Sequence, residues 1–423
     1  MKGRPENESK ALAEHFFRLE YSKIVSVITR YFGLSKVNMA EDIVQDTLLE
    51  AINSWEYKGI PENPSAWLYT VAKNKAINVL RKTKQEESYQ GANGVADLSN
   101  EITFSEEQIM DDQLRMMFAC CHPSISPEAQ TSLILKTLCG LSIGEIASAF
   151  LTSNETINKR LVRARKVLRE EQISFEIPND QLLDERLEAI LKTIFLLFNE
   201  GYSTSTGDQL INYDLCLEAI RLVEIISKHP QLGKYSTPNA LLALMLLNAS
   251  RFKARVDKDG TMIRMEHQDR KLWNQTLING GLQHLKRISD HNEISIYHIL
   301  ATISAYHCIA KSYDETNWDG ILKMYDTLVV IDNSPLVRLN RAIVLTRVEG
   351  ADSGIHELLK IKKEIPPSYY LFDSTLADLY MDTGRYKSAL KHLQNTLKQE
   401  IGGTERLVIQ RRLETCQQNL KEI

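Results

Sequence analysis

Apolar residues recur every three to four positions along almost the whole 423-residue chain, and this spacing constrains the fold more than any other feature. Such a period gathers apolar side chains on one face of a helix, whereas the alternation typical of β-strands is scarce. We therefore predict an all-α protein. The length exceeds what one hydrophobic core usually supports, so several helical domains are expected.

Local signals indicate where several helices begin and end. Asn63-Pro64 and Ser126-Pro127 each place a capping side chain before a proline, which suits the first helical position. Ser142–Glu145 and Thr152–Glu155 have the spacing of a capping box, and Gly140 fits a left-handed helix end. These signals predict two short helices separated by a tight turn between residues 141 and 170.

Charge is segregated along the chain, although the net charge of -4 is unremarkable. Residues 86–112 carry eight acidic residues and no lysine or arginine, with glycines and few large apolar residues. Residues 156–169 carry six basic residues and no acid. The first segment is expected to be a flexible acidic linker, and the second to be a nucleic-acid-binding surface.

The segment 141–169 has the pattern of a helix-turn-helix. Its second helix has an apolar stripe for the core, and its other face is polar and basic. The first turn of that helix would reach base edges, while the basic residues further along would mostly hold phosphates. The core stripe consists of Ile157, Leu161, Ala164 and Leu168. The candidate DNA-binding residues are Asn154, Glu155, Thr156, Asn158, Lys159, Arg160, Arg163, Arg165 and Lys166. A solvated basic face is the alternative, but six cations without one acid favour DNA binding.

The sequence GLSIGEIASAF followed by TINKRLVRARKVLR resembles region 4 of the sigma-70 family, which implies reading of the -35 promoter element and contact with the β flap of RNA polymerase. Other regulators carry a similar motif. This segment alone therefore leaves open a stand-alone helix-turn-helix activator with a repeat-type sensor domain.

The segment AEDIVQDTLLEAINSW, residues 40–55, resembles sigma region 2.2. The resemblance implies a helix that docks on the clamp of the polymerase's largest subunit. Asp42, Asp46 and Glu50 share one helical face, and Gln45 is added to the expected docking residues. An ordinary amphipathic helix with an acidic outer face is the alternative.

The next segment, NPSAWLYTVAKNKAINVLRK at 63–82, resembles sigma regions 2.3 and 2.4, which melt and read the -10 element. Melted DNA is bound by cations, aromatic platforms and amides, and the loop at 57–63 implies a pocket for a flipped base. Trp67 is equally compatible with a core position. The candidate residues are Lys58, Asn63, Trp67, Tyr69, Lys73, Asn74, Asn78, Arg81 and Lys82.

Both modules in this order, joined by the acidic linker, resemble the extracytoplasmic-function group of sigma factors. The implied partners are core RNA polymerase and promoter DNA. The stretch 191–208 and the C-terminal repeats resemble a subgroup with a fused helical C-terminal domain, which is expected to contact the sigma domains and regulate them. The expected domains are 1–85 for region 2, 86–112 for the linker, 113–175 for region 4, 180–290 for a helical extension and 291–423 for repeats.

A repeat supports the last of these boundaries. Small residues recur 34 and 35 positions apart at two places in each unit, as in tetratricopeptide repeats, where they let paired helices approach. They are Cys308, Ala342 and Ala377 in one series, and Gly320, Gly354 and Ala389 in the other.

Signatures of catalysis and of cofactor or metal binding are missing from the sequence, so we expect neither an enzyme nor a bound cofactor or metal. Cys120-Cys121-His122 allows a metal patch, but core packing is favoured because adjacent helical side chains diverge. The sequence contains no apolar run long enough for a membrane helix and no apolar segment after its first basic residues. We expect a cytoplasmic protein, and a pocket in the C-terminal half stays open as a third, enzymatic interpretation.

Overall fold

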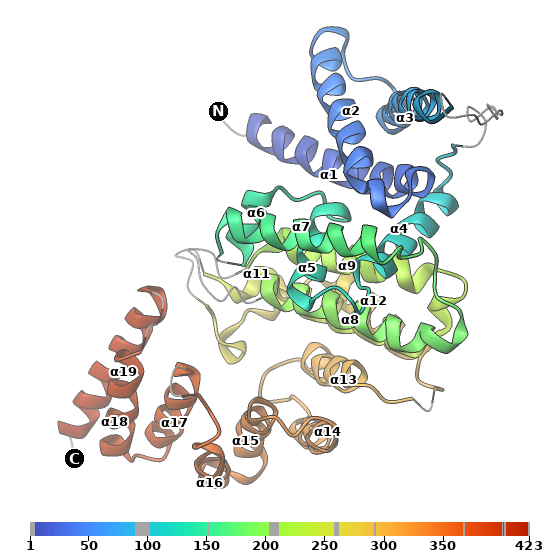
Figure 1. Ribbon diagram of the computed structural model, residues 1–423. Helices are drawn as coiled ribbons and strands as arrows, with labels where there is room; N and C mark the ends of the chain where they lie inside the picture. Colours follow the sequence, from blue (N-terminus) through green and yellow to red (C-terminus); the bar gives the residue numbers. More distant parts are fainter. Residues whose placement is uncertain are drawn as a thin grey trace. The chain divides into compact units, whose positions relative to one another are not determined.

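The chain is all-α in its computed structural model, as the periodicity predicts (Figure 1). The structure describes residues 5–88, 102–150, 152–202, 211–257, 262–291, 293–366, 369–399, 401 and 403–421. Within these ranges no strand forms, and the one β-bridge pairs Val256 with Met262. The chain divides into two compact units. The first comprises Met1–Glu200 and Glu224–Pro230, and the second comprises Gly201–Val223 and Gln231–Ile423.

Three helices open the first unit. Helix α1 (Pro5–Phe32) packs against α2 (Val37–Lys58) and α3 (Pro64–Ser88), with the short 3-10 helix η1 (Leu34–Lys36) joining the first two. Ile24, Val25, Ile28 and Leu68 are completely buried between them. Buried residues on α2, among them Ile43 and Val44, pack inward as well, so the opposite faces of α2 and α3 point outward.

Four further helices of the first unit contain the helix-turn-helix. They are α4 (Glu106–Cys120), α5 (Pro127–Thr137), α6 (Ile143–Ala149) and α7 (Asn154–Glu170). Helix α7 packs on α5 and α6, and α4 packs on α1. Most of α8 (Asp180–Tyr202) also belongs to this unit, where Arg186 donates a hydrogen bond to the carbonyl oxygen of Phe118 on α4.

The first half of the second unit surrounds a buried helix, α10 (Ser236–Ala249), which packs on α12 (Gln275–Arg287) and α13 (Ile296–Ile309). The start of α9 (Tyr213–Lys228) and the short α11 (Phe252–Arg255) also belong to it. Short 3-10 helices lie at Leu232–Lys234 (η2), Met265–His267 (η3) and Arg270–Leu272 (η4). Helix α10 is apolar around almost its whole circumference, which explains its central position.

Helical hairpins follow, and successive helices pack on one another (Figure 1). They are α13 with α14 (Trp318–Ile331), α15 (Pro335–Glu349) with α16 (Ala351–Ile361), and α17 (Tyr370–Asp382) with α18 (Tyr386–Leu397). Helix α19 (Gly403–Lys421) packs on α18.

The recurring small residues lie where these helices pack together. A Cβ on Gly354 would stand 2.9 Å from the carbonyl oxygen of Ala342 and 2.1 Å from Thr346 Cγ2, so α15 and α16 need glycine there. Ala377 and Ala389 are fully buried between α17 and α18.

Most local signals are confirmed, and two are wrong. Ser126 is the N-cap residue of α5, but its side chain makes no capping hydrogen bond. Pro64 and Pro127 begin their helices, and Gly140 has a positive φ of 65°. The predicted cap at Thr152 is incorrect. Ser153 caps α7 by accepting from the amide of Thr156, because the Thr152 amide is already bonded to the Ala147 carbonyl at 2.9 Å. The middle of the predicted linker, residues 89–101, lies outside the described residues.

Asp112 is a fully buried carboxylate on α4. It accepts a hydrogen bond of 2.9 Å from Gln108, and Arg30 lies 3.8 Å from it. Burial raises its pKa to about 6, and the hydrogen bond and the two nearby arginines only partly offset that effect. The folded protein therefore binds a proton at this group more tightly than the unfolded chain does.

Cys120 and Cys121 are buried, which favours the core interpretation over the metal patch. Burial raises the pKa of both thiols, to about 12 for Cys121. Across the described ranges no three histidine, cysteine or acidic side chains converge as a metal site would require. Among the same residues, no helix combines the length and apolar character needed to cross a bilayer.

Candidate polymerase- and DNA-binding surfaces

The outer face of α2 carries the predicted docking residues. Asp42, Gln45, Asp46 and Glu50 are all exposed, while Ile43, Val44, Thr47 and Ala51 are buried. Burial of that second set holds the helix in a fixed rotation, so the four polar side chains are presented to solvent together. An exposed acidic stripe on a rigid helix suits a partner with a basic surface.

Exposed apolar side chains continue this stripe, and the sequence interpretation missed them. Leu49 is 58% exposed, Ile52 52% and Tyr57 85%. Leu49 and Tyr57 line an open hollow of about 660 Å³ together with Asp46, Asn53 and Lys58. Large apolar groups in solvent beside acids usually mark a contact with another protein. The sequence signal that could have predicted these exposed apolar residues is their spacing from Asp42 along the helix.

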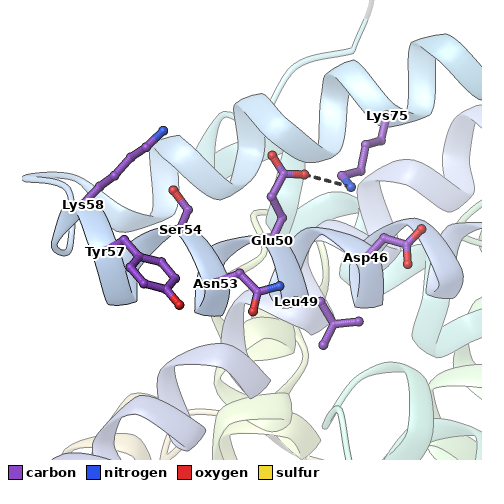
Figure 2. A pocket seen from close by; sticks show the side chains of 8 residues that line it. All are labelled: Asp46, Leu49, Glu50, Asn53, Ser54, Tyr57, Lys58 and Lys75. Carbon is purple, nitrogen blue, oxygen red and sulfur yellow. Dashed lines mark ion pairs between the residues drawn. The ribbon is translucent and has the colours of Figure 1, made fainter.

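Helix α3 closes the other side of this hollow. Lys75 reaches from α3 to Glu50, with 2.9 Å between Nζ and Oε2 (Figure 2). Figure 2 shows Glu50 pointing toward α3, whereas Leu49 projects from the opposite side of α2. Glu50 is therefore partly neutralised, and Asp42 and Asp46 are the stronger candidates for a basic partner.

The outward face of α3 presents amides and cations in a row. Asn74, Asn78, Arg81 and Lys82 lie on it, and Lys73 is half-buried beside them. Asn63 has a second task, because its side chain caps α3 by accepting from the amide of Ala66 at 3.0 Å. Lys58 is the exposed last residue of α2, and Gly59 after it has a φ of 79°.

The two aromatic candidates on α3 have different surroundings. Trp67 packs edge-on against Trp55, with 5.5 Å between ring centroids. Tyr69 is stacked on Phe104, with centroids 4.7 Å apart and ring planes 6° apart. Burial and a hydrogen bond with Glu20 raise the pKa of Tyr69. Phe104 therefore covers one face of the Tyr69 ring.

Helix α7 confirms the predicted division into core and surface. Its buried residues are the four of the expected stripe. Asn154, Glu155, Asn158, Lys159, Arg163 and Lys166 lie on the surface, and Thr156 and Arg160 are half-buried. An ion pair of 2.7 Å joins Lys159 to Glu155. The Thr156 side chain and amide both contact the capping Ser153.

Val162 is a surface residue that the sequence interpretation missed. Its side chain is 63% exposed and lies in an open hollow of about 440 Å³ with Asn158, Lys159 and Arg163. An apolar group within a polar recognition face suits the methyl group of thymine. The sequence signal that could have predicted this position is a single apolar residue, Val162, on the otherwise basic face of the helix.

Arg165 lies away from this surface. Its guanidinium pairs with Glu41 on α2, and the carboxylate is only 6% exposed. A second ion pair joins Arg18 on α1 to Glu145 at the start of α6, and Gln113 donates to Ser22 at 2.7 Å. Within the first unit, ion pairs thus join the helix-turn-helix to α1 and α2, and α7 packs on η1.

Comparison with known proteins identifies domains in the chain that contains these surfaces. Residues 16–86 match the model of sigma-70 region 2, residues 115–168 match that of sigma-70 region 4, and residues 186–289 match a family of unknown function (DUF6596). The ECF RNA polymerase sigma-E factor of Haemophilus influenzae is 26% identical over 158 residues, covering 35% of this chain and 80% of the relative. Together these matches support an extracytoplasmic-function factor of the sigma-70 family.

Two further relatives match different lengths of this chain. The ECF RNA polymerase sigma factor SigG of Mycobacterium tuberculosis is 27% identical over 150 residues, which are 30% of this chain and 40% of SigG. An uncharacterized protein of Rhizobium meliloti is 31% identical over 370 residues, 85% of each chain, and so also matches the C-terminal extension. No solved structure matches. The match to region 2 favours a sigma factor over the stand-alone activator.

Proposed function

We propose that this sigma factor binds core RNA polymerase through α2, reads the -35 and -10 promoter elements through α7 and α3, and is regulated by its C-terminal extension. The observation that carries the proposal is the exposed stripe of acidic and apolar residues on α2. The same unit also exposes the polar, basic faces of α3 and α7. A stand-alone DNA-binding regulator has no need for such a stripe. The protein would act in the cytoplasm as a non-enzymatic subunit, with region 4 on the β flap.

Roles within the docking face follow from exposure and charge. Asp42, Gln45 and Asp46 would meet the basic surface of the clamp, and Leu49 and Tyr57 would supply the apolar contact. Glu50 would contribute less because Lys75 already pairs with it.

Roles within the DNA faces follow from chemistry. On α7, Asn158 and Glu155 would contact base edges, while Arg160, Arg163 and Lys166 would hold phosphates. On α3, Asn74 and Asn78 would read separated bases, and Lys73, Arg81 and Lys82 would track the backbone. Trp67 is half-buried and would offer the accessible part of its ring face for stacking, whereas Phe104 would have to leave the ring face of Tyr69 that it covers.

Transcription from a library of genomic fragments by purified core polymerase tests this assignment. The sigma factor should direct a discrete set of start sites. Asn158→Ala should relax base preference near -35, and Asn78→Ala should relax it near -10, because each removes one amide from one face. A start-site set that does not depend on the added protein would contradict the proposal.

Regulation by the extension has a separate test. Arg186 on α8 is partly buried and donates to the carbonyl of Phe118 on α4, which supports coupling between the extension and region 4. Arg186→Ala should change promoter-dependent output without changing affinity for core polymerase. Lys192→Ala, an exposed change on the same helix, is the matched control. Identical output from both variants and the wild type would reject this coupling.

A further inference from the structure

The second unit contains an open groove of about 500 Å³ on its helical hairpins. Residues of α15 and α17 form its walls, and Tyr313 also lines it. Apolar side chains such as Ile343 and Leu379 are mixed there with charged ones. The groove therefore offers both apolar area and specific polar contacts, as peptide-binding grooves do.

A segment of the chain's own extension already lies in this groove. Ile263–His267, which we name the strap, contributes Arg264, Met265 and Glu266 to the lining. Its base is fixed by the bridge between Val256 and Met262 and by a hydrogen bond of 2.7 Å from the Ile263 amide to the Arg255 carbonyl. The strap ends in the 3-10 helix η3 and is not part of a helical hairpin.

The strap is held by two ionic contacts of opposite polarity. Arg264 donates to the carboxylate of Asp378 on α17, and Arg347 on α15 donates to Glu266 at 3.2 Å. The two groove residues belong to different hairpins, so hairpin packing fixes their separation. The groove thus matches an arginine followed two positions later by a carboxylate.

Neighbouring side chains hold this pair of sites in place. Arg412 on α19 lies 3.3 Å from Asp378 and donates to Ser374 at 3.2 Å. The guanidinium of Arg347 lies 5.0 Å from the ring centroid of Tyr313. Both groove residues are therefore oriented by contacts independent of the strap, and they would keep their positions if the strap left.

The strap itself is held loosely. The side chains of Arg264 and Glu266 are 41% and 26% exposed, and ion pairs with that much solvent contribute little stability each. Tethering, which raises the local concentration of the strap, accounts for its occupancy. A free peptide with the same charge pattern can compete with it.

We propose that this groove is a peptide-binding site, that the strap is its resident occupant, and that its partner is a protein segment carrying an arginine and a carboxylate two residues later. The contacts of Arg264 and Glu266 are the template for that partner. Partner binding displaces the strap, which is a separate event from promoter recognition.

Fluorescence anisotropy with the full-length protein tests the proposal. The probe is a labelled peptide with the sequence of Met262–Gln268, MIRMEHQ. Arg264→Ala/Glu266→Ala empties the groove, so this variant should bind the probe at least about ten-fold more tightly than the wild type, whose tethered strap competes. Adding Asp378→Asn should remove that gain. The peptide MIEMRHQ, with the charges exchanged, should not bind.

Asp378→Asn could lose binding because it misfolds, so a second variant with a changed binding preference serves as a control. In the strap-emptied background, Arg347→Glu should shift the preference from MIRMEHQ to MIRMRHQ, because the groove then presents two acids. Equal probe binding by wild type and strap-emptied protein overturns the proposal. Binding of MIEMRHQ as tight as that of MIRMEHQ, or an unshifted preference in Arg347→Glu, overturns it as well.

Discussion

Replacing Glu41 with glutamine should loosen the packing of the helix-turn-helix on region 2. The Glu41 carboxylate is 6% exposed and its partner Arg165 is 21% exposed, so the pair lies between the surface and buried classes. Breaking a fully buried pair costs about 3–5 kcal/mol, and a surface pair about 0–1 kcal/mol. We expect about 1–3 kcal/mol, or a shift of about 5- to 150-fold from the packed toward the open arrangement.

A shift toward the open arrangement should raise the affinity of α7 for DNA. In the packed arrangement the Arg165 guanidinium is directed to Glu41 and is not presented with the exposed cations of α7. Glu41→Gln should therefore release α7 for DNA and raise affinity for -35 fragments. Single-molecule energy transfer between labels at Thr70→Cys and Glu170→Cys reports the opening directly, because both positions are exposed and the described native cysteines are buried or half-buried.

Controls separate opening from damage to the fold. Glu155→Gln removes an exposed ion pair within α7 that does not reach region 2, so it should leave energy transfer unchanged. Arg165→Gln should match Glu41→Gln, and the double variant should add little, since both lose the same contact. An unchanged low-transfer population in Glu41→Gln, or an equal change in Glu155→Gln, would refute this reasoning.

Three further predictions concern other parts of the first unit. Arg163→Ala should lower the slope of log affinity against log salt by about 1, as loss of one phosphate contact does, whereas Lys323→Ala should not. Asp112 has a raised pKa of about 6 in the folded chain, so the folded state binds its proton more tightly and stability falls as pH rises from about 4 to about 6. Asp112→Asn should then stabilise the protein by up to about 2–3 kcal/mol at pH 8 and by less at pH 4, as thermal melts would reveal. Native-state alkylation followed by mass spectrometry should leave Cys120 and Cys121 unmodified, and rapid labelling of either would contradict their burial.

Local chemistry explains which sequence predictions are confirmed. Proline fixes a helix start at Pro64 and Pro127 because its backbone angle suits the first helical position, and at Pro64 the Asn63 side chain adds a cap. The buried stripe of α7 follows from periodicity alone, because a helix can turn only one face to its core. The same reasoning correctly gave an all-α chain.

Long-range contacts explain what the sequence could not reveal. Arg165 and Glu41 are 124 positions apart, and no periodicity predicts their pairing. The stacking of Phe104 on Tyr69 likewise depends on where the chain returns after the linker. The Thr152 cap failed for a smaller reason, since two adjacent hydroxyl residues were possible and the end of α6 took the amide of Thr152.

Binding to core RNA polymerase tests the central claim most directly. The wild type should co-purify with core polymerase, Asp42→Ala/Asp46→Ala should bind more weakly, and Asp314→Ala/Glu315→Ala, an acidic pair in the second unit, should bind as the wild type does. The same comparison is made in the Glu41→Gln background, in which we expect α7 to be released from region 2. The account would be contradicted if neither the wild type nor Glu41→Gln bound core polymerase. It would also be contradicted if Asp42→Ala/Asp46→Ala bound core polymerase as tightly as the protein without these two changes.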